Sequence, residues 1–227
     1  PGPTALGGPK PCLSGPSSLD GSAGPHLVLT HLALRTCGQT ARTPSGHPPM
    51  QINDQAKAAF SYQDYTPGTR IEGVEIVDLT RFNDCGGAIT ELGRLTAGMH
   101  NQLPGFEVKQ VNYSEVEPGA IKAYHMHHRQ TDVWYVPPHD KLLLVLHDCR
   151  EGSPTEGKTM RFVLGDGRNR LVRIPPGVAH GTTNLAQEVG RIIYFVDMQF
   201  SAEPGECDEG RLPWDFLGAE IWEMVKG

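Results

Sequence analysis

The stretch that decides the fold is Ile174-Pro-Pro-Gly-Val-Ala-His180-Gly-Thr-Thr-Asn184. Proline presets one backbone dihedral angle and glycine tolerates conformations that other residues avoid, so Pro-Pro-Gly predicts a tight turn. The turn is therefore expected to deliver the imidazole of His180 onto the next strand.

A second informative stretch is Tyr124-His125-Met126-His127-His128. Side chains alternate between the two faces of a strand, so His125 and His127 are expected to point to the same side. Two imidazoles on one strand face can together meet a metal ion or a substrate. Histidine is also the side chain best suited to proton transfer near neutral pH.

Short strand-like runs surround these two stretches and are separated by Gly, Pro and Asp turns. This pattern is typical of an all-β sandwich or barrel. Helical patterns are scarce: residues 51–60 are expected to form either a short helix or a lead-in arm, and a helix is expected over 219–226. The strands are expected at 74–79, 88–92, 108–112, 121–127, 133–136, 141–147, 160–164, 171–174 and 191–196.

The composition changes sharply near Met50. Residues 1–49 are dense in Pro, Gly, Ser and Thr and contain only four charged side chains. Such a segment cannot bury enough apolar surface to offset its chain entropy, so we expect a disordered leader. Our hypothesis is that Met50 is the natural start and that the leader is not native. Residues 50–227 are expected to form one barrel domain.

Charge and cysteine content narrow the functional classes. The net charge is -6, and no long Lys/Arg run is present, which argues against nucleic acid or an anionic membrane as a partner. No apolar run reaches the roughly 18 residues of a membrane-spanning helix. The five widely spaced cysteines contain no CxxC pair, which favours free thiols and a cytoplasmic location.

The His180 stretch resembles the second motif of the cupin superfamily, PxGxxHxxxN. Gly119, His125, His127 and Asp132 resemble the first motif, with Asp in place of the usual Glu. In metal-binding cupins this resemblance implies His125, His127, Asp132 and His180 as ligands. Histidine and carboxylate together suit Mn, Fe, Ni or Zn.

A narrower resemblance, to the dTDP-4-dehydrorhamnose 3,5-epimerase family, covers roughly residues 71–222. His147-Asp-Cys-Arg-Glu-Gly-Ser-Pro-Thr155 resembles that family's VDLRxxSPT, and Ile174 to Gly181 resembles its IPPGFAHG. Other matching stretches are Asn112-Tyr-Ser114 with Gly119 and His125 (NxSxxxGVLRGLH), Asp84 to Gly87 with Glu91 (DxRGxFxE), and Leu212 to Trp222 (DDPxLxIxWP).

The resemblance implies a jelly-roll barrel that forms a homodimer, uses no cofactor or metal, and acts on a nucleotide-linked 4-keto sugar. A base removes a proton beside the carbonyl, and an acid returns one from the opposite face. His125 matches the family's base, and Tyr194 falls where its tyrosine acid lies. The substrate-binding positions fall on Glu91, Asn112, Lys122 and His180.

The sequence also departs from the family. Gly86 and Lys122 stand where the family has phosphate-binding arginines, and Thr131-Asp132 stands where it has a lysine. The family's C-terminal Asp, which pairs with the basic histidine, has no counterpart after Trp222. Asp148 is the candidate replacement partner for His125.

Two alternatives therefore remain open at the level of sequence. One is a metal-dependent cupin enzyme, and the other is a sugar-nucleotide binding module that has lost its chemistry. The acidic run from Glu203 to Glu209 is expected to be a solvated loop.

Overall fold

The computed structural model describes residues 51–62 and 68–225, so the predicted leader over 1–49 and Met50 lie outside it. The chain divides into two compact units, with the boundary after Tyr62. In the first unit, α1 (Asp54–Ala59) confirms the short helix expected within 51–60. The Asn53 side chain caps it by accepting a hydrogen bond from the backbone N–H of Ala56 at 2.8 Å.

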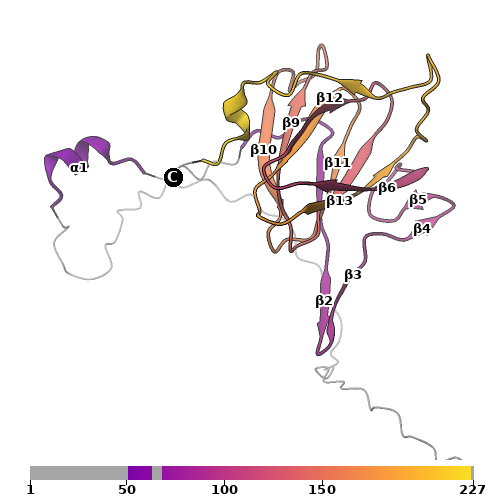
Figure 1. Cartoon of the computed structure of the whole chain (residues 1–227), viewed down its shortest axis with the longest axis horizontal. Helices are drawn as coiled ribbons and strands as arrows, with labels where there is room; N and C mark the ends of the chain where they lie inside the picture. The colour runs from indigo at the N-terminus through magenta and orange to yellow at the C-terminus, as the bar shows by residue number, and fades with distance from the viewer. Residues whose placement is uncertain (1–50, 63–67, 226–227) are drawn as a thin grey trace, which may run out of the picture. The chain divides into compact units, whose positions relative to one another are not determined.

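The second unit is built on two five-stranded antiparallel sheets (Figure 1). The first sheet has the order β1 (Glu75–Asp78), β11 (Arg170–Ile174), β8 (Asp132–Tyr135), β13 (Gly190–Val196) and β6 (Gln110–Val116). The second has the order β10 (Thr159–Gly165), β9 (Lys141–Asp148), β12 (Val178–Asn184), β7 (Ile121–Met126) and β14 (Gly210–Arg211). The predicted jelly-roll architecture of the cupin type is thereby confirmed.

The side chains of β9 alternate between the two faces of its sheet, and this alternation explains how the two sheets pack together. Its apolar run is continuous because both of its faces are covered. Leu142, Leu144 and Leu146 point into the core between the two sheets, where they pack with residues such as Trp134. Leu143 and Val145 point outward and pack against a different cluster.

Each sheet is also covered on its outer face. The first sheet packs Val133 and Tyr135 against Leu103 and Phe106, from the segment that follows the small β4 (Leu95–Thr96) and β5 (Met99–His100) pair. The second sheet packs Tyr124 against Trp222 of the C-terminal segment, with ring centroids 5.2 Å apart. Because both outer faces are covered by other segments, a ligand can be expected in the space between the two sheets.

The C-terminal helix expected over 219–226 is shorter than predicted. The structure has a 3-10 helix, η1 (Ala219–Trp222), after which the backbone is extended at Glu223. The indole N–H of Trp222 donates to the carbonyl of Trp214 at 2.9 Å, and Arg161 donates to the carbonyl of Ile221 at 2.8 Å. Arg161 therefore holds a backbone carbonyl that a longer α-helix would use internally. In the described residues, no helix has the length and apolar character needed to cross a membrane.

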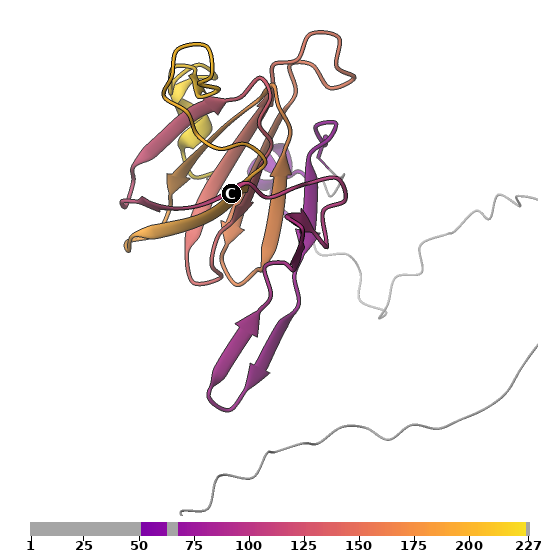
Figure 2. The ribbon, with the colours of Figure 1, turned by 90° about the vertical axis from the view of Figure 1, so that its right-hand side faces the viewer.

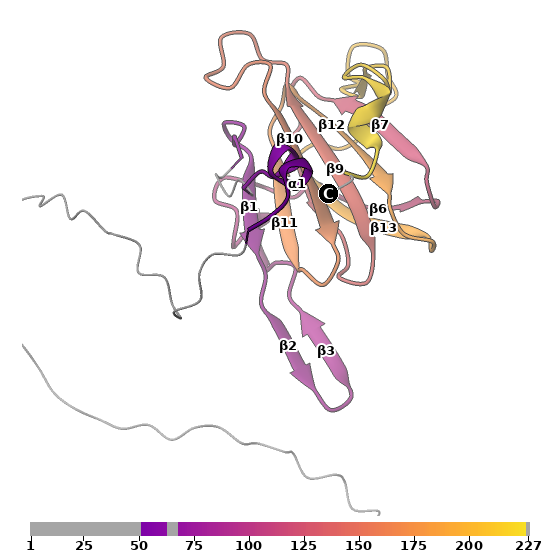
Figure 3. The ribbon, with the colours of Figure 1, turned by 90° about the vertical axis from the view of Figure 1, so that its left-hand side faces the viewer.

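A hairpin of β2 (Arg81–Asp84) and β3 (Gly87–Thr90) extends away from the two sheets, as Figure 1, Figure 2 and Figure 3 all show. Its strands pair only with each other. Phe82 and Ile89 are opposite each other in this hairpin and are 60% and 69% exposed. The hairpin therefore presents apolar surface without a partner in the described part of this chain.

Candidate active site

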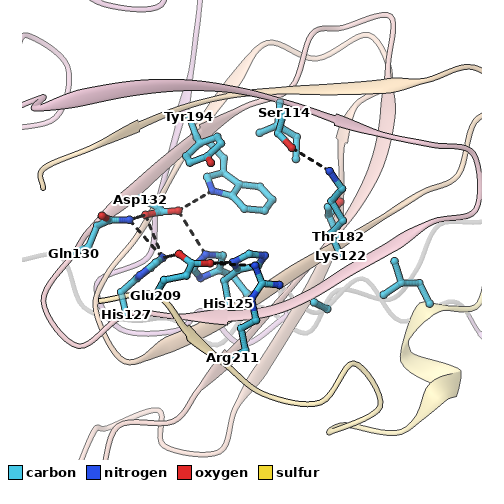
Figure 4. Close-up of a pocket in the computed structure, with 15 residues that line it drawn as sticks. Ser114, Lys122, His125, His127, Gln130, Asp132, Thr182, Tyr194, Glu209 and Arg211 are labelled. Carbon is cyan, nitrogen blue, oxygen red and sulfur yellow. Dashed lines mark hydrogen bonds and ion pairs between the residues drawn. The ribbon is translucent and has the colours of Figure 1, made fainter. Parts of the chain in front are cut away.

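A cavity of about 390 Å³ opens between the two sheets (Figure 4). Its volume lies in the range of small-molecule sites. Both sheets contribute to it, and so does the segment before β14. The lining residues are Ser114, Ile121, Lys122, Ala123, His125, His127, Gln130, Asp132, Trp134, His180, Thr182, Ile192, Tyr194, Glu209 and Arg211.

The register of β7 explains how two of its residues share the pocket. His180 of β12 is opposite His125, but Thr182 is opposite Lys122, so β7 has one extra residue between the two pairs. Strict alternation would place residues three apart on opposite faces, and a bulge of this kind corrects that. Lys122 and His125 consequently both line the cavity.

The segment before β14 gives His125 a carboxylate partner. β14 pairs with β7, so that Arg211 is opposite His125. Glu209, one residue before the strand, accepts a hydrogen bond from Nδ1 of His125. This hydrogen bond lowers the pKa of Glu209, which keeps the carboxylate ionised.

The neighbouring Asp208 holds this segment in place. Its carboxylate accepts hydrogen bonds from the backbone N–H groups of His128, Arg129 and Gln130, at 3.2, 2.9 and 2.9 Å. The expectation that 203–209 is only a solvated loop is therefore wrong for its last two residues. Both carboxylates have fixed places beside the end of β7.

Three buried side chains converge on the other side of His125. Asp132 lies 3.5 Å from Nε2 of His180 and 3.7 Å from Nε2 of His127. Burial would raise the pKa of Asp132, but its interactions with His180 and His127 outweigh burial and lower the pKa to about 2. Trp134 and Gln130 donate hydrogen bonds to the same carboxylate, at 3.1 and 2.8 Å.

Tyr194 faces this histidine group from the opposite sheet (Figure 4). On β13 its side chain alternates with Ile193 and Phe195, which pack on the outer face of the sheet. Burial, followed by the negative charges of Asp132 and Glu209, raises the pKa of Tyr194. The phenol therefore keeps its proton at neutral pH and can donate it.

Two cationic side chains lie at the exposed part of the pocket. Lys122 lies 3.3 Å from the hydroxyl of Ser114 and also donates to the backbone carbonyl of Glu115. Arg211 lies 3.4 Å from the Glu209 carboxylate, and its side chain is 63% exposed. Both remain accessible to an anionic group of a ligand.

The expected pairing of His125 with Asp148 does not occur. The Asp148 carboxylate is fully buried and accepts hydrogen bonds from Arg150, Ser153 and Thr155, at 2.6 to 2.8 Å. These donors, Arg150 first, lower its pKa. Asp148 is a structural anchor of its turn, and Glu209 occupies the place beside His125.

The other predicted site residues divide into two groups. His125, Tyr194, Lys122 and His180 line the cavity, as do His127 and Asp132 of the alternative metal set. Glu91 and Asn112 do not line it: Glu91 accepts a hydrogen bond from Arg94 at 2.9 Å, and Asn112 accepts one from Gln110 at 2.7 Å. Their assignment to substrate binding stays a prediction.

The family comparison agrees with this geometry. The sequence matches the dTDP-4-dehydrorhamnose 3,5-epimerase family over residues 68–215. A spore coat polysaccharide biosynthesis protein of Bacillus subtilis is 39% identical over 145 residues, which are 64% of this chain and 91% of that protein. A probable low-salt glycan biosynthesis epimerase of Haloferax volcanii is 29% identical over 145 residues, 64% of this chain and 89% of that protein.

Solved structures extend the comparison to three dimensions. A dTDP sugar isomerase from Desulfovibrio desulfuricans G20 superposes with a TM-score of 0.55 at 28% identity, covering 68% of this chain and 91% of that chain. A dTDP-4-dehydrorhamnose 3,5-epimerase from Bacillus anthracis gives 0.57 at 24% identity, covering 70% and 89%. The latter match shows the shared fold.

Proposed function

Because the chain belongs to the dTDP-4-dehydrorhamnose 3,5-epimerase family, we propose that it epimerises a dTDP-linked 4-keto-6-deoxy sugar or a related 4-keto sugar. One observation carries the proposal. His125, with Glu209 on its Nδ1, and Tyr194 line one cavity from opposite sheets. A base and an acid on opposite sides of a ligand are what an inversion by proton transfer requires.

In the proposed reaction the 4-keto group makes the hydrogens on C3 and C5 acidic. His125 accepts one proton on Nε2, because its Nδ1–H is donated to Glu209. The electron pair of the broken C–H bond moves into the carbonyl and forms an enolate. The enolate electron pair then returns to the same carbon as Tyr194 donates its phenolic proton from the other face. Solvent later takes the proton from His125 and restores the proton of Tyr194.

The two cations support a nucleotide-linked substrate. Lys122 and Arg211 line the exposed part of the same cavity. A diphosphate carries the negative charge that these side chains can neutralise, and a guanidinium can bind two phosphate oxygens at once. We assign Lys122, which stands at one of the family's arginine positions, and Arg211, which does not, to the diphosphate.

The test is to incubate the protein with dTDP-4-keto-6-deoxyglucose in heavy water and to follow deuterium at C3 and C5 by NMR and mass spectrometry. We expect exchange at one or both carbons, together with inverted product. The His125→Asn variant should lose exchange by about 10²- to 10⁴-fold. The Tyr194→Phe variant should keep exchange but lose inversion, because only the return of the proton is impaired.

The outcomes separate the remaining possibilities. Binding of the nucleotide sugar without exchange would favour a binding module and would overturn the enzymatic proposal. Exchange with a different 4-keto sugar only would keep the chemistry and change the substrate.

We also propose that the protein is a cytoplasmic homodimer. The exposed apolar pair Phe82 and Ile89 on the projecting hairpin supports a second copy as its partner. Cys85, Cys149 and Cys207 are exposed free thiols, which fits a reducing compartment.

A further inference from the structure

We propose that Arg211 couples the binding of a diphosphate to the hydrogen bond between Glu209 and His125. In the structure, His125 and Arg211 both approach Oε1 of Glu209, and a bound diphosphate draws Arg211 away from that oxygen. This coupling rests on the proposed function, to which it adds a regulation of the same site. Its consequence is a base that is better supported when the sugar is attached to a diphosphate.

The two partners of the Glu209 carboxylate compete for one oxygen atom. Oε1 accepts the hydrogen bond from Nδ1 of His125, and a guanidinium nitrogen of Arg211 lies 3.4 Å from the same oxygen. This separation is long for a hydrogen bond, so the guanidinium attracts the carboxylate without holding it firmly. The positive charge nevertheless weakens the pull of the carboxylate on the imidazole proton.

Arg211 reaches the carboxylate from the more exposed part of the cavity. Its side chain is 63% exposed, whereas those of Glu209 and His125 are 30% and 25% exposed. The guanidinium can therefore turn toward a ligand while the carboxylate and the imidazole stay confined. Exposed ion pairs of this kind contribute little stability, so an anionic ligand can replace Glu209 as the partner of Arg211.

The backbone of this segment is fixed on both sides of the two charged residues. On one side, the Asp208 carboxylate accepts hydrogen bonds from the backbone N–H groups of residues 128–130. On the other side, Leu212 and Tyr124 exchange two backbone hydrogen bonds, at 3.0 and 3.1 Å. A ligand can therefore change the side-chain contacts of the segment without moving its backbone.

A diphosphate is the class of ligand that separates the two contacts. It carries more negative charge than a single carboxylate, and a guanidinium can bind two of its oxygens at once. Arg211 then turns to the phosphate oxygens, and their negative charge repels the Glu209 carboxylate. His125 remains as the donor to Oε1, and the hydrogen bond between the two becomes stronger.

Lys122 provides a contrast within the same cavity. Its ammonium group lies 3.3 Å from the hydroxyl of Ser114 and donates to the backbone carbonyl of Glu115. Among the described residues, no hydrogen bond or ion pair joins Lys122 to Glu209. Lys122 therefore attracts the diphosphate without acting on the base, and Arg211 is the positioning residue that has both contacts.

The test adds inorganic pyrophosphate to the full-length protein, with its histidines labelled by heavy nitrogen, and follows the Nδ1 proton of His125 by NMR. His125→Asn identifies the signal by its loss. We expect pyrophosphate to move the signal downfield, because the hydrogen bond to Glu209 becomes stronger. In Arg211→Met the signal should stay in place, and Arg211→Lys should restore part of the shift. Lys122→Met, the matched control, should show the full shift at a higher pyrophosphate concentration.

A second measurement connects this contact to the reaction. The sugar is supplied without its nucleotide, as 4-keto-6-deoxyglucose in heavy water, and deuterium exchange is followed with and without pyrophosphate. Because remote binding energy can be used at the reacting carbon, pyrophosphate should accelerate exchange by about 10-fold in the parent. It should not accelerate exchange in Arg211→Met, whose folding is checked by a thermal melt.

Three results would overturn the coupling: pyrophosphate does not bind, it leaves the Nδ1 signal of the parent unchanged, or it moves the signal equally in folded Arg211→Met. An exchange rate of the free sugar that does not respond to pyrophosphate would overturn it as well. The NMR result does not require turnover. A shifted signal together with no exchange from dTDP-4-keto-6-deoxyglucose would support the coupling and contradict the proposed function alone.

Discussion

At the scale of single residues, the partner of His125 decides which ring nitrogen is free to act. The Glu209 carboxylate can only accept, so Nδ1 of His125 carries a proton and Nε2 is left as the basic atom. The same carboxylate stabilises the imidazolium that forms when the base takes a proton. In the proposed reaction, this contact would fix Nε2 of His125 as the atom that accepts the proton.

We therefore predict that Glu209→Gln lowers kcat by about 100-fold with little change in KM. The glutamine amide can donate to Nδ1 and so place the proton on Nε2, the wrong tautomer for a base. The loss should be visible in steady-state kinetics across pH, and Glu209→Asp should recover part of it. The exposed Glu203→Gln serves as the matched control. An unchanged kcat in a folded Glu209→Gln protein would contradict the assigned role.

Tyr124 contrasts with His125 in its hydrogen bonding. Tyr124 is fully buried against Trp222, and within the described residues its hydroxyl is the buried side-chain group without a hydrogen-bond partner. Burial raises its pKa to about 12.

Because an unsatisfied buried hydroxyl costs free energy, Tyr124→Phe should raise the free energy of unfolding by about 1 kcal/mol. Denaturant titration with a constant m-value would measure the gain. Tyr135→Phe is the control, because the Tyr135 hydroxyl donates to Asn169 at 2.9 Å and its loss should destabilise the fold. A loss of stability in Tyr124→Phe would show that this hydroxyl has a partner.

At the scale of elements, the end of β9 depends on the buried Asp148. Since its folded-state pKa is lowered, its contribution to stability is present above its unfolded pKa of about 4 and disappears as the pH falls through the folded value. Asp148→Asn should cost about 3 kcal/mol at pH 7.

The difference between parent and variant should shrink as the pH is lowered below about 4, because the unfolded chain then binds a proton at Asp148 while the folded carboxylate stays ionised until its lowered pKa is reached. Chemical denaturation at a series of pH values checks this. The exposed Asp215→Asn should show no comparable cost. A difference that is independent of pH would assign the effect to packing and not to the charge.

The strands were predictable from the sequence where their composition is apolar. The runs at 141–147, 171–174 and 191–196 match β9, β11 and β13 within one residue at each end, since central strands need apolar side chains on one or both faces. β2 and β14 were missed because they are short or polar and are defined by pairing alone.

Prediction of the candidate site from the sequence is limited in the same way, because local motifs can be recognised and long-range pairing cannot. His125 and His180 were found because motifs with fixed spacing position them. Glu209 was missed because its place depends on the pairing of Arg211 with His125, a contact 86 residues apart in sequence that no local pattern encodes. Asp148, the candidate partner that the sequence offers, lies inside a recognised motif and anchors a turn there. Only the register between β14 and β7 identifies Glu209 as the carboxylate beside His125.

At the scale of the whole molecule, the projecting hairpin is the feature that one chain leaves without a partner. We predict that Phe82→Ser combined with Ile89→Ser converts the proposed homodimer into a monomer, because it removes the exposed apolar pair. Light scattering coupled to size exclusion over a range of concentrations measures the mass. Phe200→Ser, at an exposed phenylalanine outside the hairpin, should leave the mass unchanged. A parent protein that is monomeric at all concentrations would contradict the prediction.

The two-residue strand β14 has a consequence for how the protein could be switched off. The exposed segment from Ala202 to Cys207 is the tether that leads into Glu209. A single proteolytic cut there would separate β14 and the C-terminal segment covalently from the other strands of the two large sheets, and would leave the Glu209 carboxylate less firmly held beside His125. Cleavage of this surface loop would therefore abolish the proposed activity before the protein unfolds. A folded but inactive population of the protein would accumulate.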